Sequence, residues 1–205
     1  GISKVEYGGL ALAALAYLVS QQQDKIGLYA FGPRPAALHV PPRAKGNHLA
    51  DVLAVLDAAI ADTGTGDASP ADALDRIGEL ARRRRALVVL ASDLFDPDDR
   101  TLPALRRLRA LRHDVVVLHV LAPEERTLPY EGLTLFEALE GDHKLLANPS
   151  AIRADYVAKM DAFLARVTDE LGRAGVDYHL AETTRPLDET LLALVAARRG
   201  PRERR

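Results

Sequence analysis

The sequence predicts a doubly wound α/β fold, in which a mostly parallel sheet is flanked by helices. Helical and strand-like segments alternate along most of the chain, the pattern of α/β domains with parallel sheets. Two short segments, 86–91 and 114–121, are apolar at nearly every position, which indicates strands buried on both faces. The chain has 205 residues, of which 48% are hydrophobic, enough for one domain with a substantial core.

Composition excludes several classes of site. The formal net charge is −2, which argues against a nucleic-acid surface across the whole domain. Cysteine is absent, so disulfides, zinc–thiolate sites and thiol nucleophiles are excluded. No apolar run approaches the ~20 residues that span a bilayer, and the start lacks a signal-peptide pattern. Because the chain starts with Gly1 rather than Met, we expect a fragment of a longer protein.

The first quarter of the chain predicts a helix followed by a hairpin. Ser3 and Glu6 have capping-box spacing, and the helix that they open is expected to end between residues 19 and 21. It is apolar almost all round, so we expect it to be buried beneath the sheet. Alternation over 24–31 predicts a strand that returns over 37–40. The hairpin is expected at a sheet edge and to end at Pro41–Pro42.

The rest of the chain continues the alternation as one domain over residues 1–205, with a flexible tail over 200–205. The segment 86–91 is expected to be a central parallel strand. Ser69 and Pro70 are a typical N-cap and first helical residue. The other expected elements are helices over 47–60, 101–111, 149–174 and 187–197, strands over 114–121 and 176–181, and a small inserted β-hairpin near 133–147.

Acidic side chains follow the first apolar strand. Ser92, Asp93 and Asp96 come together at the carboxyl end of segment 86–91, the edge where α/β sheets bind ligands. Hard cations such as Mg²⁺ prefer carboxylate and hydroxyl oxygens. The residues by themselves favour the alternative that Asp93 and Asp96 only cap the next helix or shape the turn.

A polar loop over 62–70 supplies further candidate ligands. It contains Thr65, Asp67 and Ser69, and together with Asp93 these residues form the predicted Mg²⁺ site. The alternative for Ser69 is that its hydroxyl only caps the helix that it starts.

Recognisable catalytic and nucleotide-binding motifs are absent from the sequence. No G-x-S-x-G elbow surrounds Ser92, no Walker A motif occurs, and no two histidines have the i, i+4 spacing of a metal pair. We therefore expect no catalytic residues. The run Arg82–Arg85 is expected to complete a helix C-terminus, and an anionic partner remains the alternative.

Many segments, in order, resemble the bacterial DUF58 family over about Ser3 to Arg198. The similar segments are Ser3–Tyr7, Asp24–Leu28, Val88–Asp96, His113–Val116, Leu121–Arg126, Leu128–Gly132 and Pro186–Asp188. The resemblance implies a sheet like that of von Willebrand factor A domains and a metal-ion-dependent adhesion site. It also implies a MoxR-type AAA+ ATPase as partner. Family members often carry upstream transmembrane helices, so the domain is expected in the cytoplasm, tethered to the inner face of the plasma membrane.

The sequence departs from the family pattern at two points. The family's first strand, which ends in Asp-x-Ser-x-Ser, is missing, although it would lie at the centre of the sheet between 24–31 and 86–91. An unfilled gap would leave buried backbone groups unpaired, so we expect a strand from upstream, or else another chain's strand or a rearranged sheet, to fill it. The family's metal-binding Thr corresponds to Ala68. Its role would have to be taken by Ser69, Thr65 or Asp67. Asp93 matches the third element of the family's metal motif well. We therefore expect the metal site to be degenerate.

The leading hypothesis is therefore a non-enzymatic protein-interaction domain of von Willebrand A type. It would be assisted by Mg²⁺ and would work with a MoxR-type AAA+ ATPase. The alternatives are a metal-dependent hydrolase that uses Asp93 and Asp96, which would need a general base, and a structural module with an empty crevice.

Overall fold

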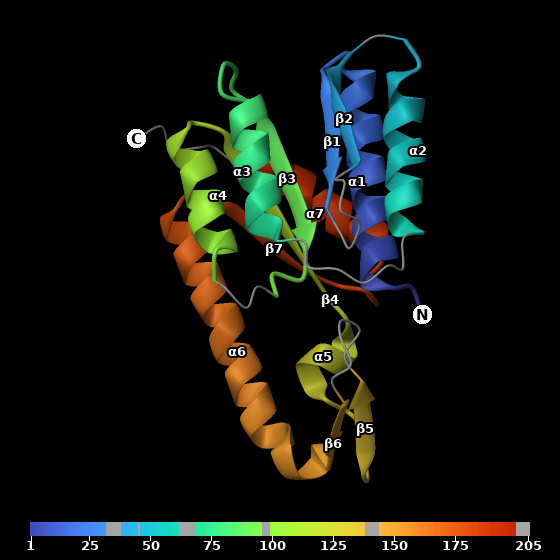
Figure 1. Cartoon of the computed structure of the whole chain (residues 1–205), viewed down its shortest axis with the longest axis vertical. Coiled ribbons are helices and arrows are strands. Elements are labelled where there is room, and N and C mark those ends of the chain that lie inside the picture. The colour runs from blue at the N-terminus through green and yellow to red at the C-terminus, as the bar shows by residue number, and fades with distance from the viewer. Residues whose placement is uncertain (32–37, 45, 62–68, 96–98, 138–143, 200–205) are drawn as a thin grey trace.

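The computed structural model describes residues 1–31, 38–44, 46–61, 69–95, 99–137 and 144–199. Its centre is a parallel sheet of β3 (Leu87–Ser92), β4 (Asp114–Leu121) and β7 (Asp177–Glu182), in the order β3-β4-β7 (Figure 1). β4 is buried along nearly its whole length, as its unbroken apolar run predicts. The mixed α/β class with a parallel sheet flanked by helices is thus confirmed.

Helices cover both faces of this sheet. One face packs against α3 (Pro70–Leu80), α4 (Thr101–Ala110) and α6 (Pro149–Arg173), and the other against α1 (Lys4–Gln21) and α7 (Leu187–Arg199). Alternate residues of β4 divide between the two cores: Val115 and Val117 join the first, and Val116 and Leu118 the second. This division follows from the two-residue period of a strand.

The predicted N-terminal hairpin forms a separate two-stranded sheet, β1 (Ile26–Ala30) and β2 (Leu38–Arg43), packed against α2 (His48–Ile60). The prediction that Pro41 and Pro42 end the second strand is wrong, because β2 runs through both. A Cβ on Gly27 would lie 2.9 Å from Cγ of Pro42, so only glycine leaves room for the proline ring. The missing amide hydrogens of proline do no harm on an edge strand.

The first apolar strand is not central in the described part of the chain. Among the residues that the structure describes, β3 pairs with β4 along one edge only, and β1 pairs only with β2. α1 packs against both β1 and β3, so one helix underlies the facing edges of the two sheets. β4 holds the central position that we predicted for segment 86–91.

The first helix is less buried than predicted. Its capping box of Ser3 and Glu6 is present, but only four residues, the last of them Ala11, are buried. Leu10 and Tyr17 are exposed, because α1 packs with one side on the sheet and leaves part of its surface uncovered.

The remaining local predictions have mixed outcomes. Ser69 caps α3 through its hydroxyl and Pro70 opens the helix, as predicted, whereas Asn47 precedes α2 without a side-chain capping bond. The inserted hairpin is present as β5 (Thr134–Glu137) and β6 (Lys144–Ala147). A short helix, α5 (Pro123–Thr127), was not predicted. The tail 200–205 lies outside the described residues, and among those described no helix could cross a bilayer.

Candidate functional site

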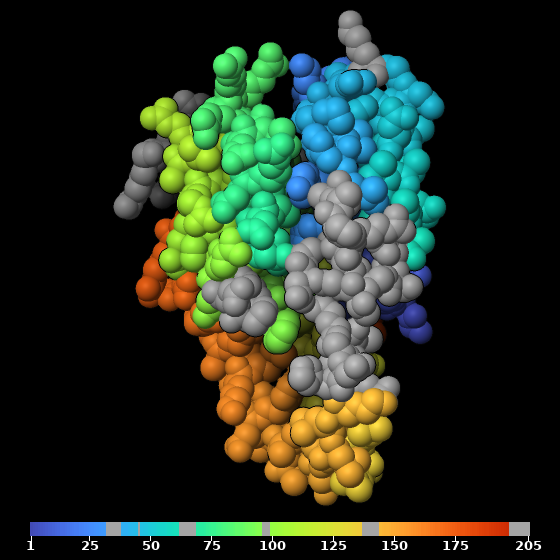
Figure 2. Space-filling model, in the orientation of Figure 1, coloured from blue at the N-terminus to red at the C-terminus, as the bar shows by residue number. Residues whose placement is uncertain are grey.

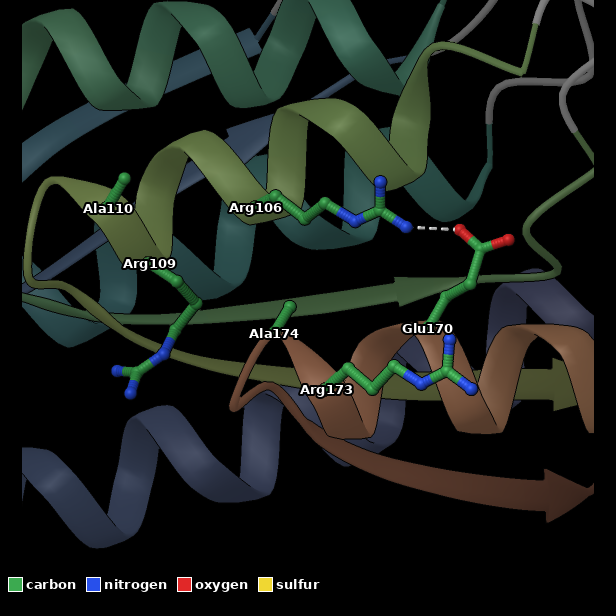
Figure 3. A pocket seen from close by; sticks show the side chains of 6 residues that line it. All are labelled: Arg106, Arg109, Ala110, Glu170, Arg173 and Ala174. Atoms are coloured by element: carbon green, nitrogen blue, oxygen red, sulfur yellow. Dashed lines mark hydrogen bonds and ion pairs between the residues drawn. The ribbon is translucent and has the colours of Figure 1, made fainter. Parts of the chain in front are cut away.

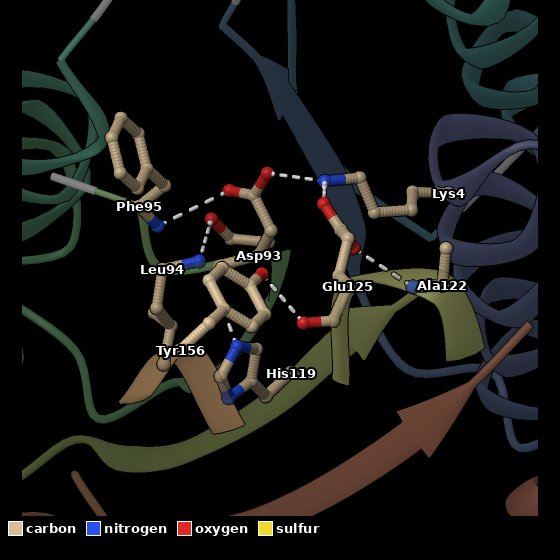
Figure 4. A network of polar contacts seen from close by, with 9 residues as sticks. Lys4, Asp93, Leu94, Phe95, His119, Ala122, Glu125 and Tyr156 are labelled. Atoms are coloured by element: carbon tan, nitrogen blue, oxygen red, sulfur yellow. Dashed lines mark hydrogen bonds and ion pairs between the residues drawn. The ribbon is translucent and has the colours of Figure 1, made fainter. Parts of the chain in front are cut away.

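A polar cluster lies at the carboxyl end of the sheet, where Asp93 follows β3 (Figure 4). The Nζ atom of Lys4 donates to Oδ2 of Asp93 at 2.8 Å and to Oε1 of Glu125 at 2.6 Å. Lys4 is in the first turn of α1 and Glu125 is in α5. The ammonium group therefore joins three elements that are far apart in the sequence.

The turn after β3 has a strained backbone that several hydrogen bonds hold. Leu94 has φ 54°, a conformation that costs a non-glycine residue about 1–2 kcal/mol. Its amide donates to Oγ of Ser92 at 3.0 Å, and the amide of Phe95 donates to Oδ1 of Asp93 at 3.2 Å. Burial of the Leu94 side chain offsets the cost. The turn thus fixes the Asp93 carboxylate, and Phe95 is left 79% exposed.

His119 supports this turn from inside the sheet. It is fully buried in β4, with Nε2 2.8 Å from the carbonyl oxygen of Asp93 and Nδ1 2.7 Å from the hydroxyl of Tyr178. A carbonyl oxygen only accepts, so Nε2 carries the proton and Tyr178 donates to Nδ1. Burial lowers the pKa of His119, against the opposing effect of Asp93 and Glu125, and burial raises the pKa of Tyr178 to about 12. Both groups are neutral near pH 7.

Helix α6 fixes the segment that carries Glu125. Oε2 of Glu125 accepts from the amide of Ala122 at 2.9 Å, and its carbonyl oxygen accepts from the hydroxyl of Tyr156 at 2.6 Å. Arg153 donates to the carbonyl oxygens of Leu128 and Tyr130 at 2.9 and 2.8 Å. Side chains of α6 therefore hold α5 and the chain that leads to the hairpin.

The electrostatics of the cluster favour the charged form of Lys4. Burial alone would lower its pKa, but the hydrogen bonds and charges of Asp93 and Glu125 outweigh burial, and the pKa is raised. Two carboxylates and one ammonium group thus share a site in which each side chain is about one-third exposed.

The side chains that the structure describes do not fit a Mg²⁺ ion as they lie. Asp93 is engaged by the ammonium group of Lys4, whose charge would repel a divalent cation. Ser69 accepts from the amide of Ala71 at 3.2 Å and caps α3. Thr65, Asp67 and Asp96 lie outside the described residues. Within those that are described, no group of three His, Cys, Asp or Glu side chains could hold a metal.

The hairpin β5–β6 extends beyond the cluster and forms the lower end of the molecule (Figures 1 and 2). Leu135 pairs with Leu146 across the strands, and Phe136 pairs with Leu145, so the two pairs lie on opposite faces. Leu135, Leu145 and Leu146 are 52%, 63% and 59% exposed. An isolated two-stranded sheet is marginally stable at best, and this one has exposed apolar side chains on both faces.

Sequence reasoning identified Asp93 but missed Lys4, Glu125 and His119. Lys4 and Glu125 lie 89 and 121 positions from their partners, and no local spacing signals such a contact. The one available signal was Pro123 followed by Glu125, which predicts a helix start with an acidic cap.

Comparisons with known proteins give a family and a fold. The model of the DUF58 family, described as a protein of unknown function, matches residues 2–164. The uncharacterized proteins Mb1516 of Mycobacterium bovis and Rv1480 of Mycobacterium tuberculosis are each 30% identical over an alignment of 196 residues, and the alignment covers 92% of this chain. The chain spans 59% of the length of each of these relatives.

A solved structure shares the fold. The crystal structure of the conserved hypothetical protein BatB from Bacteroides thetaiotaomicron aligns with a TM-score of 0.53 and 17% identity, over 94% of this chain and 85% of that one. Together with the match over residues 2–164, the segment order described above identifies the chain as a member of the DUF58 family.

Proposed function

We propose that this chain is a non-enzymatic protein-interaction domain of von Willebrand A type whose partner is a MoxR-type AAA+ ATPase. The observation that carries the proposal is the exposed apolar hairpin β5–β6 beside the polar cluster. Exposed apolar surface of this kind is typical of contact sites between proteins, and the leucines on both faces gain from burial by a partner.

The polar cluster supports this surface. Lys4, Asp93 and Glu125 join α1, the end of β3 and α5, and Arg153 holds the chain between α5 and the hairpin. Exposed Phe95 lies beside the cluster (Figure 4). In this account Lys4 supplies the positive charge at the carboxyl end of the sheet, and the partner binds without Mg²⁺.

The von Willebrand A architecture further requires a strand between β1 and β3. Each strand is paired along one edge only in the described residues, and α1 packs against both. We propose that a strand from outside residues 1–205 pairs with these edges and completes one continuous sheet. Unpaired backbone groups invite such pairing. Tethering to a membrane by upstream segments remains part of the same proposal.

The hydrolase alternative stays an untested prediction. Asp96 lies outside the described residues, and Asp93 is engaged by Lys4. The buried His119 makes hydrogen bonds through both ring nitrogens, so it is not available as a general base.

Binding of the ATPase to hairpin variants tests the proposal. Leu135→Ser combined with Leu146→Ser removes one apolar face, and Leu80→Ser with Leu192→Ser is a matched control at exposed positions of α3 and α7. We expect the hairpin variant to lower affinity for a MoxR-type ATPase of the same organism at least ~tenfold, from about 1.4 kcal/mol or more of lost burial. Unchanged affinity, or an equal loss in the control, would contradict the proposal.

A further inference from the structure

The opposite end of the parallel sheet has an excess of arginine. Helices α3, α4 and α6 all end there, because each immediately precedes one of the parallel strands. We call this end, toward the upper left of Figure 1, the arginine end. Its guanidinium groups belong to Arg82, Arg83, Arg84, Arg85, Arg106, Arg109, Arg112 and Arg173.

Acidic side chains neutralise only part of this charge. Arg106 pairs with Glu170, Arg173 with Asp169, and Arg85 and Arg109 share Asp114. In the described part of the chain, no carboxylate pairs with Arg82, Arg83, Arg84 or Arg112, all of which are exposed. Asp177 at the start of β7 and the C-termini of three helices, at about −0.5 charge each, reduce the surplus without cancelling it. A chain with net charge −2 thus has a strongly positive end.

Exposed leucines stand among these arginines. Leu80 ends α3, Leu87 begins β3 and Leu111 follows α4, and their side chains are 51%, 42% and 51% exposed. Interspersed cationic and apolar side chains are the composition of surfaces that bind the interface of an anionic bilayer.

A cleft between α4 and α6 opens at the same end (Figure 3). It has a volume of about 570 Å³ and is lined by Arg106, Arg109 and Arg173, among others. Arg106 and Arg173 point into it from the two helices (Figure 3), and the guanidinium group of Arg109 is turned toward the carbonyl oxygen of His113 and the carboxylate of Asp114.

We propose that the arginine end docks on the phosphate surface of an anionic lipid bilayer, with Leu80, Leu87 and Leu111 entering the interface. The charges come from three separate segments that end on one side of the molecule, and a planar anionic surface engages all of them at once.

Vesicle sedimentation tests the proposal. The probes are vesicles of phosphatidylcholine alone and of an equal mixture of phosphatidylcholine and phosphatidylglycerol. We expect the chain to sediment only with the anionic vesicles at ~0.15 M salt and to be released near ~1 M salt, where screening is much shorter in range. Inorganic phosphate at matched ionic strength should not release it. Failure to bind the mixed vesicles, or release by inorganic phosphate, would overturn the proposal.

Charge variants then locate the surface. Arg83→Gln with Arg84→Gln should lower partitioning roughly 30-fold, since each basic residue near the surface contributes about a factor of five. The control, Lys144→Gln with Lys159→Gln, removes two exposed charges elsewhere and should change partitioning less than about threefold. Equal effects of the two pairs would refute an oriented contact.

A single tryptophan reports which end enters the interface, because the chain contains none. The emission of Leu80→Trp should shift to the blue on mixed vesicles, and that of Leu145→Trp in the hairpin should not. A shift at Leu145→Trp alone would reverse the proposed orientation and contradict the inference.

Discussion

Replacing Lys4 by methionine tests whether the polar cluster holds three elements together. Methionine keeps most of the apolar length of lysine but removes the ammonium group, so Asp93 and Glu125 lose their shared donor. The two carboxylates then face each other without a counter-charge, which adds repulsion to the lost hydrogen bonds.

The expected loss follows from partial exposure. The side chains of Lys4, Asp93 and Glu125 are 28%, 37% and 35% exposed. Exposed ion pairs contribute about 0–1 kcal/mol, and breaking a buried pair costs about 3–5 kcal/mol. Because this cluster is partly screened by solvent, its loss should cost an amount between these two ranges, about 2 kcal/mol of the free energy of unfolding. For a chain of this length we expect Tm to fall about 4–8 °C.

Thermal unfolding measures this loss of stability. The control is Lys25→Met, which removes an exposed lysine. In a double-mutant cycle, Lys4→Met should couple to Asp93→Asn by about 1 kcal/mol. Folding raises the pKa of Lys4 above its ordinary value of 10.5. The ammonium group therefore contributes its full stabilisation at pH values below 10.5, and this stabilisation is lost as the pH rises through the pKa of Lys4 in the folded state. A Tm of Lys4→Met equal to that of the parent would show that the ammonium group does not hold the three elements together.

Three further predictions concern metal, pH and packing. Millimolar Mg²⁺ or Mn²⁺ should leave the Tm of the parent unchanged, since Lys4 engages Asp93, and a rise that Asp93→Asn abolishes would show a working metal site. Burial lowers the pKa of His119, so the folded state binds fewer protons and stability should fall as the pH drops below about 6.5. His119→Gln should reduce that slope, and an unaltered slope would contradict the role of burial. Gly27→Ala should cost about 1–3 kcal/mol, because its Cβ would lie 2.9 Å from the carbonyl oxygen of Val40. Gly172→Ala, with open space around its Cβ, should instead stabilise α6 by up to about 1 kcal/mol, and denaturant unfolding of both variants checks the difference.

Local rules predicted the elements that local interactions determine. Ser69 and Pro70 start α3 as their types suggest, and the apolar run of β4 is buried on both faces. The course of β2 through Pro42 escaped prediction because it depends on Gly27 in the neighbouring strand.

The candidate site was predictable only in part, for a similar reason. Asp93 is at the carboxyl end of an apolar strand, which the sequence shows directly. Its partner Lys4, and Glu125 that shares the Lys4 ammonium group, are brought to it by the packing of α1 and α5, a long-range effect. The φ of 54° at Leu94 could not be anticipated, since leucine rarely adopts it.

Amide hydrogen exchange of the chain, with and without a purified MoxR-type ATPase, would locate the contact surface directly. We expect new protection over residues 134–137 and 144–147 of the hairpin and in the turn 93–95, with exchange at the arginine end unchanged. Absence of protection at saturating ATPase, or protection confined to surfaces away from the hairpin and the polar cluster, would contradict an interaction surface at the carboxyl end of the sheet.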